Sequence, residues 1–103
     1  MIRVSVMYPY GKGTTFDMPY YTSKHMPMVK RLCGAACKSI AVDRGLNAGQ
    51  PGSTPTYIAA GYLTFDSVEA FEKAFGPHAG EIMADIPNYT NAKPVVQISE
   101  ITL

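Results

Sequence analysis

The chain has 103 residues, nine Lys or Arg against eight Asp or Glu, a formal net charge of +1 and 47% apolar residues. Its length suits one domain, so we expect residues 1–103 to form a single unit. The near-zero charge excludes the broad basic surface that most nucleic-acid-binding domains need. No run of about 18 apolar residues is present to span a membrane, and the N-terminal residues alternate instead of forming a signal peptide. We therefore expect a cytoplasmic protein.

The two cysteines, Cys33 and Cys37, are separated by Gly-Ala-Ala. This is not the C-x-x-C spacing of a redox or zinc site, and no histidine lies nearby to complete a metal set. We expect both thiols to be small buried hydrophobic residues. The sequence gives no sign of a metal site or of a haem, flavin or nicotinamide cofactor.

Residues 2–9 alternate between apolar and other side chains, which predicts a half-buried strand with Ile2, Val4, Val6 and Tyr8 on one face. Pro9 and a glycine-containing turn end it. The Gly-Lys-Gly segment of that turn lacks the spacing and the terminal Lys-Ser/Thr of a phosphate-binding loop.

A helix is predicted to begin at Asp17 as N-cap and to end at Gly34. Pro27 lies inside it and has no N–H to donate to the carbonyl of Ser23, so the helix should kink or widen one turn earlier. The kink lies beside His25. Helical spacing gives an apolar stripe that includes this histidine: Tyr21, His25, Met28, Val29 and Leu32.

Two further strands are predicted at 36–46 and 56–65, separated by a loop rich in Gly, Pro, Asn and Ser. Asp66 is the expected N-cap of the second helix. A short third helix over 78–85 and a last strand over 94–102 complete the chain. The second helix is expected to bury Val68, Phe71, Ala74 and Phe75.

The resulting order, β-α-β-β-α-β with one extra short helix, predicts an α+β fold of the ferredoxin-like βαββαβ type. In this sandwich a four-stranded antiparallel sheet carries its helices on one face. The other face would hold Met7, Val95, Ile101 and either Tyr62 or Leu63, according to register. These residues are too apolar to face water, so we expect a second copy to pack against them in a twofold dimer.

His25 is the most informative position for chemistry. On the apolar stripe its imidazole should point toward the sheet, where it can act as a general acid or base. The simpler alternative is a core histidine bonded to a backbone carbonyl that Pro27 leaves free. No Ser, Cys or Lys has a spacing that pairs with His25, and paired-carboxylate chemistry has no support.

Seven tyrosines add candidate pocket residues. Tyr21 precedes His25 by one helical turn, so the two rings should be neighbours and Tyr21 is the second candidate catalytic residue. Tyr8 at the end of the first strand, Tyr62 and His78 at the rim are candidate substrate-binding residues. Alternatively, these tyrosines are ordinary boundary residues with their hydroxyls in water.

Four segments carry a resemblance to the EthD family: VSVMYP, TFDMPYYTSKHMPMV, DSVEAFEKAFG and IPNYTNAKPVVQISEI. They span essentially the whole chain, and the combination of Y-Y-x-x-x-H-x-P with P-N-Y-T-N is the most specific part. The resemblance implies a subunit that forms a dimeric α/β barrel. It also suggests ether degradation and catabolism, because the named member is encoded beside a cytochrome P450 system that degrades fuel ethers.

The wider superfamily of dimeric α/β barrels includes cofactor-free monooxygenases, lactone isomerases and polyketide cyclases, each with a pocket between helices and sheet. One hypothesis is therefore a cofactor-free enzyme that acts on a small apolar or aromatic oxygenated metabolite, with His25 as general acid or base. A second is a non-catalytic accessory or ligand-binding dimer that supports a partner oxygenase. A third is a structural dimer without a pocket. Fold analogy alone does not separate them.

Overall fold

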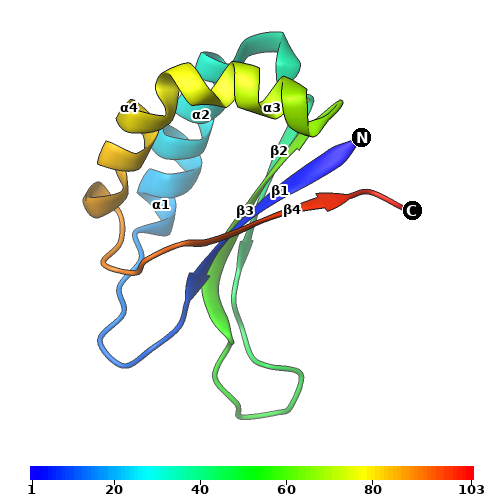
Figure 1. Cartoon of the computed structure of the whole chain (residues 1–103). Helices are drawn as coiled ribbons and strands as arrows, with labels where there is room; N and C mark the ends of the chain where they lie inside the picture. The colour runs from blue at the N-terminus through cyan, green and yellow to red at the C-terminus, as the bar shows by residue number, and fades with distance from the viewer.

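The structure is a computed structural model that describes residues 1–103. Figure 1 shows helices stacked over one face of a twisted sheet, with the strand nearest the C-terminus passing in front. The elements are, in order, β1 (Ile2–Pro9), α1 (Met18–Tyr20), η1 (Tyr21–His25), α2 (Met26–Cys33), η2 (Gly34–Ala36), β2 (Ser39–Arg44), β3 (Tyr57–Phe65), α3 (Val68–Phe75), η3 (Gly76–His78), α4 (Ala79–Ala84), η4 (Ile86–Asn88) and β4 (Val95–Glu100).

The sheet has the strand order β2-β3-β1-β4, and every neighbouring pair is antiparallel. Strand β1 lies in the centre, where Val4 pairs with Leu63 on one side and Ile98 on the other. This order and the helices on one face confirm the ferredoxin-like α+β fold that the sequence predicts. The register also decides between Tyr62 and Leu63: Leu63 faces the helices and Tyr62 lies on the opposite face.

The first helix widens at the predicted place. Asp17 accepts a hydrogen bond from the backbone N–H of Tyr20 and starts α1. The next five residues form the π-helical segment η1, which closes with the N–H of Met26 bonded to the carbonyl of Tyr21. Pro27 sits just beyond it and withholds an N–H from the ladder, which is a recognised cause of such a bulge. The sequence therefore predicted the irregularity correctly.

Several element boundaries differ from the prediction. The second strand is Ser39–Arg44, shorter than 36–46, because Gly34 takes a positive φ of 65° and η2 follows it. The third strand, Tyr57–Phe65, begins one residue later than predicted. The last strand is Val95–Glu100 instead of 94–102, and the third helix is α4, Ala79–Ala84, preceded by the 3₁₀ turn η3 in place of a single helix over 78–85.

The start of α3 also differs. Ser67, not Asp66, is the N-cap, because its hydroxyl accepts a hydrogen bond from the N–H of Ala70. As a consequence Val68 occupies the first helical position and is 43% exposed, so it is not part of the buried stripe. Phe71 and Phe75 pack against the core as predicted, and their rings stack at a centroid distance of 5.0 Å.

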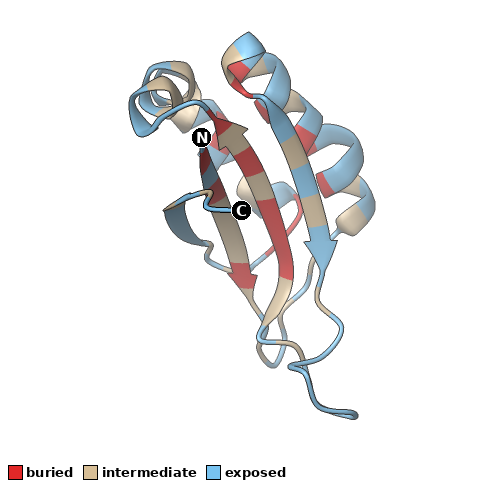
Figure 2. Cartoon of the chain, turned by 90° about the vertical axis from the view of Figure 1, so that its right-hand side faces the viewer, coloured by how far each residue is buried: buried red, intermediate tan, exposed pale blue.

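The core lies between the helices and the two central strands, where Figure 2 shows most of the buried residues. Both cysteines are free and buried in it, as predicted. Strand β4 is different, because its helix-side residues Val96 and Ile98 remain 54% and 39% exposed. The helices therefore cover β1 and β3 but leave β4 open.

The outer face of the sheet is less apolar than predicted. Met7 pairs with Ala60 on β3 and with Val95 on β4, which gives one apolar row across three strands. The adjacent rows carry mainly polar side chains: Ser5, Tyr62 and Gln97 in one, and Arg3, Thr64 and Ser99 in the next. An apolar surface is thus limited to one end of this face.

Candidate functional site

His25 is the last residue of the π-helical segment, and its side chain is buried between the helix and the sheet. It is 4% exposed, although it is polar and titratable. A buried polar side chain needs hydrogen-bond partners, and those of His25 are side chains. The predicted alternative, a histidine bonded to a backbone carbonyl freed by Pro27, is therefore wrong.

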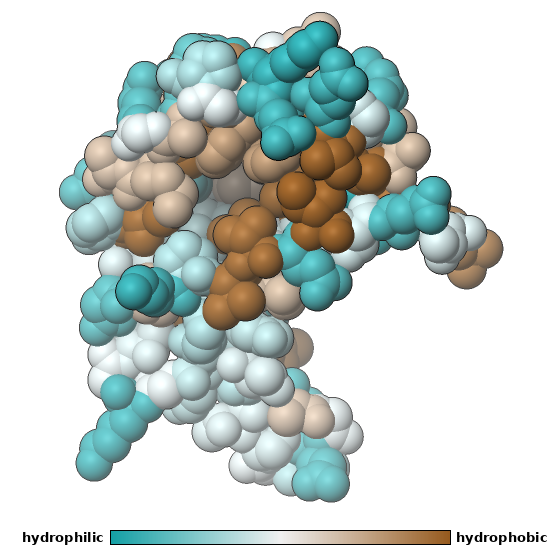
Figure 3. All heavy atoms as spheres, in the orientation of Figure 1, coloured by the Kyte–Doolittle hydropathy of each residue, from teal (hydrophilic) through white to brown (hydrophobic).

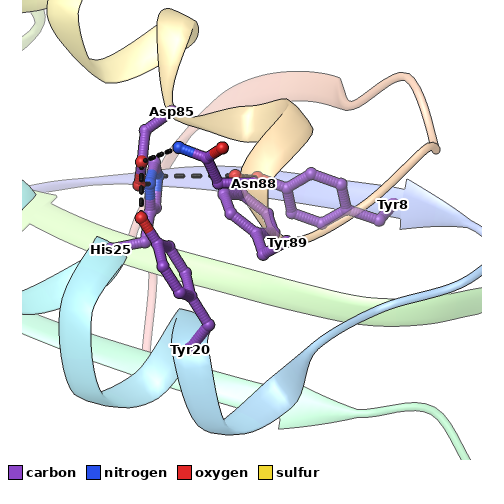
Figure 4. A network of polar contacts seen from close by, with 6 residues as sticks. All are labelled: Tyr8, Tyr20, His25, Asp85, Asn88 and Tyr89. Atoms are coloured by element: carbon purple, nitrogen blue, oxygen red, sulfur yellow. Dashed lines mark hydrogen bonds and ion pairs between the residues drawn. The ribbon is translucent and has the colours of Figure 1, made fainter.

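The partner of His25 is Asp85, the residue that follows α4. The imidazole Nδ1 lies 2.9 Å from Oδ2 of Asp85. The other carboxylate oxygen accepts hydrogen bonds from the Tyr20 hydroxyl at 2.7 Å and from the Asn88 side-chain amide at 2.9 Å. Figure 4 shows these three side chains converging on the carboxylate. They fix Asp85 so that one oxygen faces the histidine.

This contact determines the histidine tautomer. An ionised carboxylate only accepts hydrogen bonds, so Nδ1 carries the proton and Nε2 is left as an acceptor. The nearest donor is the Tyr89 hydroxyl at 3.4 Å, a long and weak contact. Tyr89 makes a much shorter bond, 2.6 Å, to the hydroxyl of Tyr8. Nε2 is thus an acceptor without a strong partner.

Burial and hydrogen bonds shift the pKa values of these groups. Burial lowers the pKa of His25 and outweighs the opposing effect of the Asp85 carboxylate. For Asp85 burial acts to raise the pKa, but hydrogen bonds from Asn88, Tyr20 and His25 together lower it. Burial also raises the pKa of Tyr8 and, more strongly, that of Tyr89. At neutral pH the site therefore holds a neutral imidazole, a carboxylate and protonated tyrosines.

These shifts predict that acid destabilises the fold. The unfolded His25 has an ordinary pKa of 6.5 and the folded one a lower value, so the unfolded state binds more protons in between. We expect the free energy of unfolding, measured by urea at pH 8 and pH 5, to fall as pH drops below 6.5. The lowered pKa of Asp85 extends the loss to more acidic pH. His25→Gln should flatten the dependence near 6.5, and an unchanged slope in that variant would contradict the assignment.

His25 lies on the wall of a cavity of about 190 Å³ between the helices and the sheet. Thirteen of its sixteen lining residues are hydrophobic, among them Val4, Leu63, Phe71, Phe75, Ile82 and Val96. Figure 3 shows apolar side chains gathered around the hollow where β4 passes beneath α3 and α4. Because Val96 and Met83 line the cavity and are half exposed, the opening lies between β4 and α4.

Tyr21 and Tyr8 line the same cavity, as the sequence predicts. The Tyr21 ring stacks on the His25 imidazole with a centroid distance of 5.4 Å and an interplanar angle of 13°. Its hydroxyl reaches over Gly61 of β3, where a Cβ atom would overlap it. Gly61 therefore provides the space that allows Tyr21 to lie flat against His25.

Two predicted site residues lie elsewhere. Tyr62 is on the outer face of the sheet and His78 is in η3, and neither lines the cavity. Sequence analysis missed Asp85, Tyr89 and Tyr20. Asp85 and Tyr89 flank the P-N segment of the motif used for the resemblance, and only the placement of η4 beside η1 brings them to His25.

No group of three or more His, Cys, Asp or Glu side chains gathers in a way that suits a metal ion. None of the helices has the length and apolar character required to cross a membrane.

Comparisons with known proteins agree with this architecture. The family model for the EthD domain matches residues 14–93. An EthD-like protein from Ralstonia eutropha JMP134 is 45% identical, with a TM-score of 0.95 over 99% of this chain and 92% of that one. No curated protein matches significantly.

Two more distant structures share the fold. A dimeric ferredoxin-like protein of unknown function from Thermobifida fusca has 14% identity and a TM-score of 0.57, over 97% of this chain and 90% of that one. A proposed antibiotic biosynthesis monooxygenase from Bordetella bronchiseptica has 12% identity and a TM-score of 0.57, over 99% and 98%. With the matches above, the sequence and fold together show that the chain belongs to the EthD family.

Proposed function

We propose that the protein is a proton-transfer enzyme for small apolar oxygenated molecules, with His25 as the general base. The observation that carries this proposal is His25 on the wall of an apolar cavity, with Asp85 bonded to it from behind. A histidine oriented by a carboxylate, whose other ring nitrogen has only a long contact with the Tyr89 hydroxyl, is an arrangement suited to general-base catalysis. Isomerases, cyclases and cofactor-independent monooxygenases all need a proton-transfer step. This step is therefore the part of their chemistry that we propose for the site.

In this step a C–H or O–H bond of the substrate breaks and its proton moves to Nε2 of His25. The electron pair of that bond remains on the substrate as an enolate or phenolate. Asp85 accepts a hydrogen bond from Nδ1–H, without taking the proton, and stabilises the imidazolium that forms. In the reverse direction His25 returns a proton to the substrate, so the enzyme ends in its starting state.

In this proposal Tyr8 stabilises the negative oxygen. It lines the cavity, and either hydroxyl of the Tyr8–Tyr89 pair can be the donor. When Tyr89 donates to Tyr8, the Tyr8 proton is available for a substrate oxygen. Because the tyrosines have raised pKa values, they stay protonated as donors while His25 accepts the proton.

Hydrogen–deuterium exchange tests the proposal without knowledge of the natural substrate. In D₂O the protein should catalyse exchange of the α-protons of a small neutral ketone such as cyclohexanone, followed by proton NMR. Asp85→Asn, which weakens the hold on the imidazole, should slow this exchange. Exchange no faster than in buffer containing free imidazole at the same concentration would count against general-base catalysis.

A second candidate function is ligand binding without turnover, as in an accessory protein of a partner oxygenase, including one that acts in ether degradation. The largely apolar lining favours it, since a few polar groups, here those of Tyr8, Tyr21 and His25, are enough to orient a ligand. Ligand binding with no exchange in the assay above would select this function.

We further propose that the protein is a cytoplasmic homodimer that pairs through the outer face of the sheet. The apolar row of Met7, Ala60 and Val95 supports this, as does the Thermobifida fusca relative described as dimeric. Val95 is 47% exposed. Introducing a charge there should leave it unpaired in the interface.

We therefore expect Val95→Lys to be monomeric by light scattering at concentrations where the parent protein is dimeric. Val68→Lys is the matched control, because Val68 is 43% exposed but lies on α3, on the other side of the sheet. A dimeric Val95→Lys variant would place the pairing surface elsewhere.

A further inference from the structure

We infer that the cavity selects neutral, one-ring molecules with a single polar oxygen, and that it binds a hydroxyl group best. The inference rests on the proposed function in one respect: the ligand hydroxyl binds His25. Charge, volume and the position of the polar atoms each limit the ligand independently.

The charge limit follows from the lining. None of the sixteen residues around the cavity is Lys, Arg, Asp or Glu. Asp85 is behind His25 and already accepts from three side chains. An ionised ligand would lose its hydration and meet no counter-ion, which makes burial of its charge strongly unfavourable. Carboxylates, phosphates and ammonium ions are therefore excluded from the interior of the cavity.

The volume limit follows from comparison with cavities of known capacity. A dry apolar cavity of about 150 Å³ in another protein holds one benzene molecule. The present cavity, at about 190 Å³, has room for one ring with one or two additional heavy atoms. A second ring does not fit inside the cavity unless the structure expands, and would have to extend through the opening between β4 and α4.

The exposed lining is almost entirely apolar, and the lining residues that carry polar side-chain atoms lie together. They are Tyr8, Tyr21 and His25: the ring centroid of Tyr21 lies 5.7 Å from that of Tyr8 and 5.4 Å from that of His25. Among them Nε2 of His25 is the acceptor whose one contact, with Tyr89, is long. A ligand with one hydroxyl satisfies this acceptor and leaves only apolar surface for the rest of the wall.

Calorimetric titration at pH 7 tests the inference with five probes. We expect 4-methylphenol to bind, and to bind about two- to ten-fold more tightly than toluene, which lacks the hydrogen bond. The anion 4-methylbenzoate, the cation benzylammonium and the two-ring 4-phenylphenol should each bind at least ten-fold more weakly than 4-methylphenol. Equal affinity for toluene, binding of either ion as tight as that of 4-methylphenol, or no binding of 4-methylphenol would overturn the inference.

Two variants locate the binding. Val96→Phe should block the opening and lower the affinity for 4-methylphenol at least ten-fold, because Val96 lines the cavity and is 54% exposed. Val68→Phe, at a similarly exposed position outside the cavity, should leave affinity unchanged. Equal affinities in the two variants would place the ligand elsewhere.

The two proposals fail separately. If calorimetry gives the expected order of affinities but the exchange assay shows no activity, general-base catalysis is wrong and the inferred ligand class stands. If the exchange assay shows activity but a charged probe binds as tightly as 4-methylphenol, general-base catalysis stands and the inferred ligand class is wrong.

Discussion

His25→Gln is expected to lower the rate of proton exchange about 10²- to 10⁴-fold, the usual contribution of a positioned general base. Glutamine keeps the approximate size and hydrogen-bonding character of the side chain but cannot accept a proton near neutral pH. The measurement is the exchange rate of cyclohexanone α-protons, with folding checked by circular dichroism.

The second histidine supplies the control. His78 lies in η3 outside the cavity, so His78→Gln should exchange protons at the parent rate. If His25→Gln and His78→Gln lose activity equally, the loss is not specific to His25 and the assignment of the base to His25 is wrong. If His25→Gln retains the parent rate, His25 serves only to complete the pocket.

Gly61→Ala is expected to destabilise the protein by about 1–3 kcal/mol, the range for overpacking a core. The added Cβ would overlap the Tyr21 hydroxyl and approach Sδ of Met26 to 3.4 Å. Tyr21 is 1% exposed and packed against Tyr8 and His25, so its ring has little freedom to move aside. The midpoint of urea unfolding measures the loss.

Gly80→Ala is the matched substitution. Nothing lies within 4 Å of a Cβ at this position of α4, and alanine is the better helix former, so a small gain in stability is expected. A Gly61→Ala variant as stable as the parent would show that Tyr21 can shift freely, and its stacking on His25 would then not be fixed by packing.

The features that could be predicted from sequence depend on local patterns. Strand β1 follows from strict alternation, and the inward position of His25 follows from helical spacing together with Pro27. The N-cap of α3 was misassigned because Asp66 and Ser67 are adjacent and both suit that role, while in the structure the Ser67 hydroxyl accepts the capping hydrogen bond from the N–H of Ala70.

The histidine's partner could not be predicted in the same way. Asp85 is 60 residues away in the chain, and its contact depends on how α4 and η4 pack over η1. Tyr89, 64 residues from His25, is brought in by the same packing. Tyr62 was wrongly included because its face depended on a register that the alternation of β3 alone did not determine.

The uncovered side of β4 has a kinetic consequence. We expect a small molecule to enter between Val96 and Met83 by movement of side chains that are already half exposed, without breaking a hydrogen bond of the sheet. Uptake and release should then occur on the timescale of rotamer changes and small helix displacements, far faster than global unfolding. Substitutions at the opening should accordingly change the residence time of the ligand, whereas substitutions in the core should change the resistance of the protein to thermal unfolding.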